Sequence, residues 1–391
     1  MVRQPSTILS VCCDSSQNSV TRGSTIWSNM SRNRFSFLPS WKSSETIDQN
    51  LRKISRDDYL TIVSLFGSLS GLVQGFLTTL SGMMLVDSEF LQEMYRQNDS
   101  RFSDRFIMLF FAGEIMGSLM SFPFSDTFGR KTTLIYTSVF CVFAIAWNVF
   151  TNSGSDFLTS RFFVGWAMGI LLSTSPVYTS EIALTAHRGF TIGMLALTTI
   201  TGSLIAAPLF YLLKNYGIGW RVCLTVPVVI LIIKAGVLTL LPESPRWLLA
   251  LHTPAECLDS MRQLRRTNDV SKEFNDIYLA LSSDARLGES WADILSSKTI
   301  RYRLFVCCVI QLSQQMMGIN IITTFGSDFL RLMDVHSVFL GLSLAYVAAF
   351  MGTLLGLSNI DVWGRRFVFL FGCCTMGGCW IAAATCVSIG K

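Results

Sequence analysis

Long apolar stretches separated by short polar connections dominate this chain. Nine stretches reach about 17–25 residues or more, the length that a helix needs to cross a bilayer. Only helices and closed barrels satisfy their backbone hydrogen bonds in lipid. The pattern therefore predicts an all-α membrane protein. The nine predicted spans cover approximately residues 59–86, 106–125, 132–151, 158–178, 189–213, 220–241, 304–327, 337–359 and 367–388.

Composition supports this interpretation. Half of the 391 residues are hydrophobic and 15% are charged, with a mean hydropathy of +0.46. Soluble domains carry about 25% charged residues. These values exclude an ordinary soluble domain and make the lipid bilayer the first expected partner.

Lysine and arginine gather on one side of the predicted membrane. They occur in the segment before the first span, in the 246–303 segment and in the connections that hold Arg130, Lys131 and Arg188. Basic residues mark the cytoplasmic side of a membrane. The N-terminus is therefore predicted to be cytoplasmic. The formal net charge of +5 follows from this bias, so nucleic acid is not an expected partner.

The spans are divided unequally along the chain. Residues 1–56 are rich in serine and are predicted to be a disordered cytoplasmic tail. We expect a six-helix bundle over 57–245, a cytoplasmic helical linker over 246–303 and a partial bundle of three spans over 304–391.

One short motif occurs twice. "DTFGRK" at 126–131 follows the second span, and "DVWGRR" at 361–366 follows the eighth. Gly129 and Gly364 permit a tight turn between antiparallel helices. For a single copy, anchoring by basic residues on the cytoplasmic side would be the favoured interpretation. Two copies at equivalent places indicate parallel repeats, the plan of one large transporter superfamily.

Four further motifs complete a family resemblance. They are "RFFVGWAMG" at 161–169, "SPVYTSEIALTAHRG" at 175–189, "LPESPRWLL" at 241–249 and "QLSQQMMGIN" at 311–320. With the paired turns, the chain resembles the sugar-porter family of the major facilitator superfamily, from about residue 59 to 388. The resemblance implies a twelve-span fold, of which this chain has the six-span N-terminal half and an incomplete C-terminal half. We expect a product truncated after the ninth span.

The resemblance also implies transport of a hexose or related sugar by alternating access. Charges at the cytoplasmic ends of spans then tie the two halves together in one conformation. Ion-pair networks present in only one state bias the equilibrium between states. The gating residues implied in this way are Asp126, Gly129, Arg130, Glu181, Arg188, Glu243, Arg246, Asp361, Gly364, Arg365 and Arg366.

Four amides lie in the predicted seventh span: Gln311, Gln314, Gln315 and Asn320. An amide in hydrocarbon without a partner costs roughly 2–7 kcal/mol, so these residues either bond neighbouring helices or line a wet site. The resemblance implies contacts with sugar hydroxyls, and Gly318 can break the helix so that Asn320 turns toward the others.

Elsewhere the chain departs from the family pattern. Ala196 and Ala349 stand where many sugar porters have amides, and Thr324 and Phe325 replace an aromatic pair. A cyclitol, an oligosaccharide or another polyhydroxylated solute therefore remains an alternative substrate.

Two ionisable residues lie at membrane depth. Glu114 in the second span and Lys234 in the sixth have comparable depths. Such residues are functional by default. Proton-coupled members of the family that the chain resembles usually carry an acid in the first span. This chain has none in the apolar run of its first span, so the resemblance favours facilitated diffusion over proton symport. Against this, Glu114 is a candidate proton carrier or a partner of Lys234, and snorkelling of Lys234 is an equal alternative.

The remaining signals are weak. "NDS" at 98–100 makes Asn98 a glycosylation candidate. The cysteines and the three scattered histidines form no metal or catalytic pattern, so no enzyme, metal or cofactor is expected. A sensor is disfavoured because no long tail follows the last span. The plasma membrane is the expected location, and the oligomeric state stays open.

Overall fold

The computed structural model describes residues 44–94, 102–184, 188–214, 219–251, 253–267, 270–285, 297–318, 323–327, 330 and 338–389. Asn98, Asn320 and most of the predicted tail lie outside these residues. The chain divides into two compact units, 1–51 and 52–391. In the first unit the described residues are helical, because α1 begins at Ser44, inside the segment predicted as a disordered tail.

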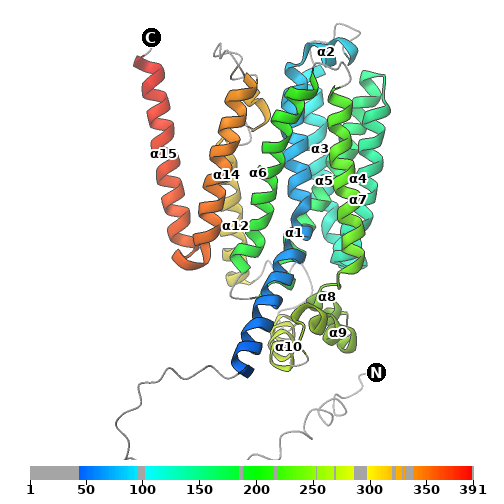
Figure 1. Ribbon diagram of the computed structural model, residues 1–391, viewed down its shortest axis with the longest axis vertical. Helices are drawn as coiled ribbons and strands as arrows, with labels where there is room; N and C mark the ends of the chain where they lie inside the picture. Colours follow the sequence, from blue (N-terminus) through cyan, green and yellow to red (C-terminus); the bar gives the residue numbers. More distant parts are fainter. Residues whose placement is uncertain are drawn as a thin grey trace, which may run out of the picture. The chain divides into compact units, whose positions relative to one another are not determined.

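The described elements are helices, as predicted (Figure 1). Each of the first six predicted spans corresponds to a helix long and apolar enough to cross a membrane, and short α2 (Ser88–Met94) follows the first. In α1 the spanning part is Tyr59–Val86. The six helices are α1 (Ser44–Val86), α3 (Phe102–Phe128), α4 (Arg130–Phe150), α5 (Gly154–Ile182), α6 (Arg188–Leu213) and α7 (Gly219–Leu240).

Glycines bring α3 and α5 into close contact in this bundle. A Cβ on Gly117 of α3 would lie 2.0 Å from the carbonyl oxygen of Trp166, and one on Gly165 of α5 would lie 2.1 Å from that of Phe110. Small residues spaced four apart let membrane helices approach to backbone contact. The position of α5 against α3 therefore depends on these glycines.

Aromatic packing fixes the end of the bundle near α2, here called the α2 end. The ring of Phe90 on α2 lies 5.5 Å from Phe157 of α5 and 5.3 Å from Trp220 of α7. Phe106 of α3 stacks on Phe157 at 5.8 Å. Such pairs add about 0.5–1.5 kcal/mol each beyond their buried area. One buried residue of α2 thus joins helices that are distant in sequence.

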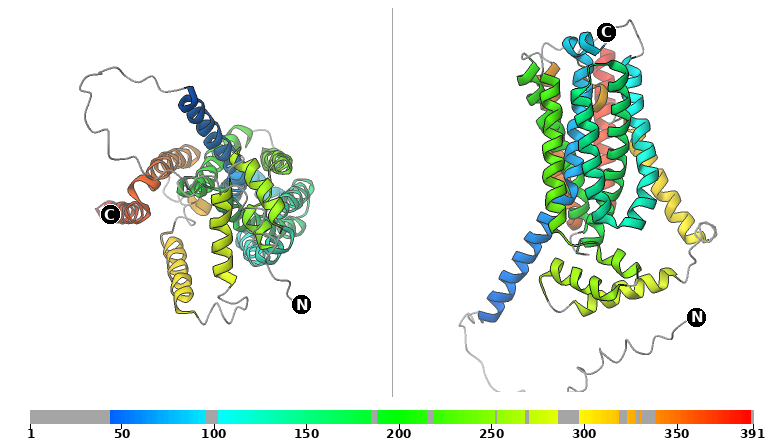
Figure 2. Two further views of the ribbon diagram at one scale, coloured as in Figure 1. Left: turned by 90° about the horizontal axis from the view of Figure 1, so that it is seen from below. Right: turned by 90° about the vertical axis from the view of Figure 1, so that its right-hand side faces the viewer.

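Three short helices lie together near the opposite end of the bundle (Figure 2). They are α8 (Pro245–Ala250), α9 (Pro254–Arg265) and α10 (Ser271–Ala285), so the described part of the predicted linker is largely helical, as expected. The buried guanidinium of Arg265 donates to the Glu273 carboxylate at 2.5–3.2 Å and to the carbonyl oxygen of Ile182 at 2.9 Å. These bonds connect the helices to α5. We call this end the insert end.

The second half consists of α12 (Lys298–Met316), helical residues 323–327, α14 (Val338–Trp363) and α15 (Arg365–Ile389). α14 packs on α6, and α15 packs on α14. α14 is the seventh candidate span within the described residues, and α12 and α15 are not among the seven. The predicted seventh span is interrupted, because α12 ends at Met316 and Gly318 has a φ of +73°.

Candidate functional site

The first repeat of the turn motif forms a one-residue corner between α3 and α4. Gly129 has a φ of +92°, a conformation that glycine adopts without strain. A Cβ there would lie 2.7 Å from Oε2 of Glu243. Backbone conformation and space both require glycine, so the predicted tight turn is confirmed.

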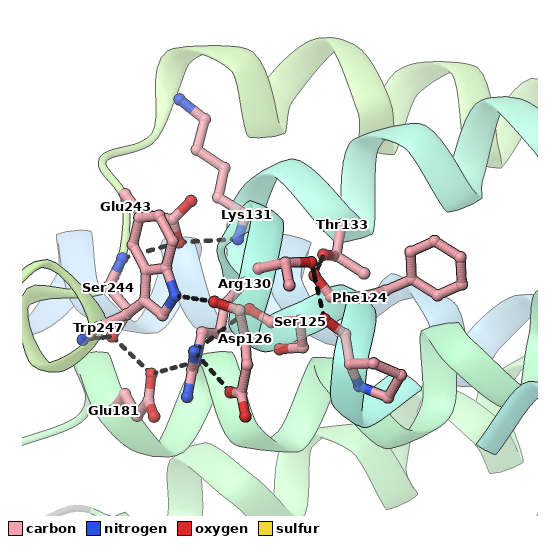
Figure 3. Close-up of polar contacts among 12 residues, drawn as sticks. Phe124, Ser125, Asp126, Arg130, Lys131, Thr133, Glu181, Glu243, Ser244 and Trp247 are labelled. Carbon is pink, nitrogen blue, oxygen red and sulfur yellow. Dashed lines mark hydrogen bonds and ion pairs between the residues drawn. The ribbon is translucent and has the colours of Figure 1, made fainter. Parts of the chain in front are cut away.

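Arg130, the residue after this corner, lies between two carboxylates (Figure 3). Its Nη1 is 3.1 Å from Asp126 and its Nε is 3.3 Å from Oε2 of Glu181 on α5. The side chains of Arg130 and Glu181 are 16% and 11% exposed. Solvent therefore screens this pair less than it screens an ordinary surface pair, which contributes about 0–1 kcal/mol.

Glu243, which follows α7, caps the start of α4. Its Oε1 accepts hydrogen bonds from the backbone amides of Lys131 at 2.9 Å and Ser244 at 3.0 Å. A carboxylate at a helix N-terminus is stabilised by the helix dipole. Ser244 in turn donates to Oε2 of Glu181 at 2.5 Å. The charges of α3, α5 and the α7–α8 connection thus meet at one place.

Trp247 of α8 closes this arrangement by donating from Nε1 to the carbonyl oxygen of Asp126 at 2.9 Å (Figure 3). The structure therefore brings together five predicted gating residues within the first half. We call them the N-half cluster: Asp126, Gly129, Arg130, Glu181 and Glu243.

The second repeat has the same corner but different neighbours. Gly364 has a φ of +83°, and a Cβ there would have no described atom within 4 Å. Arg365 and Arg366 are exposed and form no ion pair with another described residue. Asp361 instead reaches the first half, where its Oδ2 accepts from the backbone amide of Phe190 at 3.0 Å.

Arg188 and Arg246, the other two predicted gating residues, line a cavity beside Glu181. Glu181 itself pairs with Arg130 of the N-half cluster. The described contacts of the predicted gating charges therefore lie mainly inside the first half, with Asp361 as the connection between halves.

The predicted amide site is only partly described. Gln311 and Gln315 share one face of α12, and Gln314 adjoins them. All three side chains are exposed, and no side chain of α12 is buried. The predicted break at Gly318 is present. The described residues do not enclose these amides.

The sequence analysis missed a contact between the halves at the α2 end. Ser327 donates to the carbonyl oxygen of Gly82 at 2.8 Å, and Thr79 of α1 donates to the hydroxyl of buried Tyr346 of α14 at 3.0 Å. A Cβ on Gly82 would lie 2.4 Å from the carbonyl oxygen of Thr324. Small polar residues carry no strong sequence signal, so this contact was not predictable.

A buried arginine was also missed. Arg161 of α5 is 2% exposed and donates to Ser81 of α1, with its guanidinium carbon 4.5 Å and 4.7 Å from the ring centroids of Phe106 and Phe110. The predicted fourth span began at residue 158, so Arg161 was expected within one turn of the membrane surface. The helix begins earlier, at Gly154, so Arg161 lies deeper in the span than expected. An arginine inside an apolar span was the sequence signal that could have identified it.

The predicted pairing of Glu114 with Lys234 is wrong. Gln74 donates to Oε1 of Glu114 at 2.6 Å, and Arg161 interacts with that carboxylate electrostatically. Lys234 is fully buried, and its Nζ has no hydrogen-bond partner among the described residues. The alternative of snorkelling is wrong as well, since a snorkelling lysine keeps its ammonium group in water.

The described residues contain no group of three or more His, Cys, Asp or Glu side chains that could hold a metal ion. What this arrangement can do is mechanical. Hydrogen bonds and ion pairs hold α3, α4, α5 and α8 together. The halves meet where α14 packs on α6 and through hydrogen bonds at each end.

Comparison with known proteins gives the family. Residues 60–391 match the family model described as "Sugar (and other) transporter". Sugar transport protein 1 of Arabidopsis thaliana is 30% identical over 75% of this chain and 57% of its own length. Major facilitator-type transporter ecdD of Aspergillus rugulosus is 28% identical over 80% of this chain and 60% of its own. The proton myo-inositol cotransporter of Homo sapiens is 27% identical over 81% of this chain and 50% of its own length. The chain thus spans about half to two thirds of these transporters.

Solved structures agree on the fold. The major facilitator superfamily proton:xylose symporter XylE, bound to 6-bromo-6-deoxy-D-glucose, has a TM-score of 0.67 at 20% identity and covers 79% of this chain and 71% of that one. The partially occluded inward-open form of the xylose transporter XylE from E. coli has a TM-score of 0.63 at 19% identity. The match covers 78% of this chain and 74% of that one. The predicted fold class is therefore confirmed, with its multi-pass membrane character. The chain belongs to the sugar transporter family of the major facilitator superfamily.

Proposed function

We propose that this chain carries a hexose or a related sugar across a membrane by alternating access. The observation that carries the proposal is the way the halves meet: α14 packs on α6, and hydrogen bonds add to this contact at each end. Asp361 contacts Phe190 at the insert end, and Ser327 contacts Gly82 at the α2 end. Each is one hydrogen bond, worth about 0.5–1.5 kcal/mol net, or more for the charged group. Contacts of this size can break and re-form during a transport cycle.

In this proposal residues 57–245 act as one body and 304–391 as part of the other, with 246–303 linking them. The N-half cluster keeps the corner after α3 fixed to α5 and α8, so the first half rocks without deforming. Asp361 then gates the insert end, and Arg188, Arg246, Arg365 and Arg366 are assigned to the same gate by their positions at helix ends. Parallel repeats that rock around a central site are the general plan for such carriers.

The proposed substrate site comprises Gln311, Gln314, Gln315 and Asn320. Amides offer both donors and acceptors, which suits the hydroxyls of a neutral polyol. The left-handed conformation of Gly318 supports the site, because it ends α12 just before Asn320 in the sequence. The small-molecule sugar is the partner, and neither a cofactor nor catalysis enters this function.

We further propose that the insert end and the N-terminus face the cytoplasm and that the chain resides in the plasma membrane. The support is the excess of lysine and arginine in the connections at the insert end. Glycosylation at Asn98, which the sequence assigns to an external connection, would agree with this orientation.

A cyclitol is the second candidate substrate. Two relatives are named for inositol, the human cotransporter and probable inositol transporter 3 of Arabidopsis thaliana. Many family members have an amide at the position of Ala196 on α6, where this side chain offers no hydrogen bond. Ala196 therefore does not select for the hydroxyl groups of glucose.

The test is uptake of radiolabelled glucose and myo-inositol by this 391-residue chain in cells that lack their own carriers. Gln315→Ala is the variant, and Asn275→Ala, which removes an exposed amide from α10, is the control. Saturable uptake that Gln315→Ala abolishes and Asn275→Ala preserves supports the proposal. No uptake of either solute by protein present at the membrane contradicts transport by this chain. Uptake that survives Gln315→Ala contradicts the proposed site.

A further inference from the structure

A cavity of about 480 Å³ lies at the insert end, outside the proposed sugar path. Its walls come from the end of α5, the start of α6, α8 and the α9–α10 region. Small-molecule sites usually measure about 300–1,000 Å³. The cavity is thus large enough for a small organic ligand.

The charges that line the cavity do not balance. Four basic side chains face three acidic ones there. Two of the acids are already engaged, because Glu181 pairs with Arg130 from outside the cavity and Glu273 pairs with Arg265. Arg246 also has a contact of its own. The remaining lining charges are those of Arg188, Lys272 and Asp276. The cavity therefore keeps a surplus of positive charge.

Arg188 shows where an anion would be bound. Its Nε is buried and has no hydrogen-bond partner among the described residues. A buried donor left unpaired destabilises the protein, and a charged donor does so more than a neutral one. A phosphate oxygen would satisfy it, and the planar guanidinium suits phosphate better than an ammonium does. Leu184, Val270 and Ile277 supply an apolar wall for the organic part of the ligand.

We propose that this cavity binds an organic phosphate, with Arg188 and Lys272 as its contacts. The site is distinct from the sugar amides on α12. Because its walls belong to the bundle and to α8–α10, an occupant would fasten these helices to the start of α6, the helix that Asp361 contacts. Binding there would regulate the insert end without taking part in transport itself.

The experiment measures binding to the purified full chain in detergent by titration calorimetry, at fixed ionic strength. Glucose 6-phosphate is the probe, and glucose is the unphosphorylated control. Arg188→Gln should weaken binding by about tenfold or more, because a hydrogen bond to a charged group is worth about 1.5–3 kcal/mol. Lys272→Gln, on the exposed rim, should weaken it less. Arg262→Gln, with the same charge change on α9 outside the cavity, should leave it unchanged.

A second arm separates a soluble phosphate from a lipid headgroup. The same proteins are placed in nanodiscs of phosphatidylcholine with or without phosphatidylinositol 4-phosphate, and thermal stability is measured. Stabilisation by that lipid alone, lost in Arg188→Gln and reduced in Lys272→Gln, supports the site and identifies its source as the bilayer. Binding of neither probe, or binding that both variants leave unchanged, overturns the proposal. Since no transport is measured, these outcomes are independent of the proposed carrier function.

Discussion

The carboxylate of Asp361, near the end of α14, accepts a 3.0 Å hydrogen bond from the backbone amide of Phe190, near the start of α6. Gly189 allows this approach, since a Cβ there would lie 2.3 Å from Oδ1 of Asp361. One half thus places an anion at a helix N-terminus of the other, where the dipole favours negative charge.

Asp361→Asn should loosen the insert end. The amide keeps the shape of the side chain but removes the charge, whose interaction with a helix N-terminus is worth about 0.3–1 kcal/mol. The ratio of closed to open insert end should fall about two- to fivefold. Distances between spin labels on α6 and α14 would report this change. Asp259→Asn, at an exposed position of α9, is the matched control. An unchanged distribution in Asp361→Asn would refute a gating role.

Gly82→Ala and Gly189→Ala should shift the same equilibrium in opposite directions. The added methyl of Gly82→Ala meets the backbone carbonyl of Thr324, which can yield only by moving its helix. The methyl of Gly189→Ala meets the side chain of Asp361, which can turn away. Gly82→Ala should therefore open the α2 end strongly, and Gly189→Ala should open the insert end weakly. Spin-label distances at both ends measure this. Gly236→Ala, with no described atom within 4 Å, is the control, and equal shifts in one direction would contradict the assignment of the two contacts.

Gly129→Ala should destabilise the protein more than Gly364→Ala. Both glycines have a positive φ, at which alanine costs about 1–2 kcal/mol. Only at Gly129 must the Glu243 carboxylate also move, and overpacking of this kind costs typically about 1–3 kcal/mol. Heating the detergent-purified variants and following the loss of folded protein gives the order. Equal stabilities would mean that the N-half cluster adjusts without cost.

Glu114→Gln tests proton coupling. The variant side chain can still pair with Gln74 but cannot release a proton. If Glu114 carries the proton, sugar uptake by the wild type rises as the outside pH falls, and uptake by the variant does not depend on pH. Glu89→Gln, exposed on α2, should behave like the wild type. Uptake independent of pH in both the wild type and Glu114→Gln would remove the proton from the mechanism.

Lys234→Met should stabilise the first half. The buried ammonium has no hydrogen-bond partner among the described residues, and an unsatisfied buried group costs about 1–3 kcal/mol. Methionine fills a similar volume without that cost. The variant should melt at a higher temperature in detergent. Leu231→Met, buried one turn earlier on α7, should give no such gain. A lower melting temperature for Lys234→Met would show that the ammonium is satisfied in the membrane.

Local chemistry in the sequence was enough to predict several features. The apolar runs predicted the first six spans because each helix must cover the bilayer thickness with apolar residues. The repeated acid-x-x-Gly-basic motif predicted both corners, since a one-residue turn there needs a positive φ. Gly318 predicted the interruption after α12 for the same reason.

The choice of neighbours could not be predicted in this way. Helical rise gave Glu114 and Lys234 similar depths, and depth alone suggested that they pair. Depth does not say which helices touch, however: α3 packs against α5, while α7 packs against α4. Glu114 consequently lies with Gln74 and the missed Arg161, and Lys234 has no hydrogen-bond partner among the described residues. The membrane-spanning segments and their turns could be predicted from the sequence, because those properties depend on neighbouring residues. The charges that meet could not, because their pairing depends on the rotation and packing of whole helices.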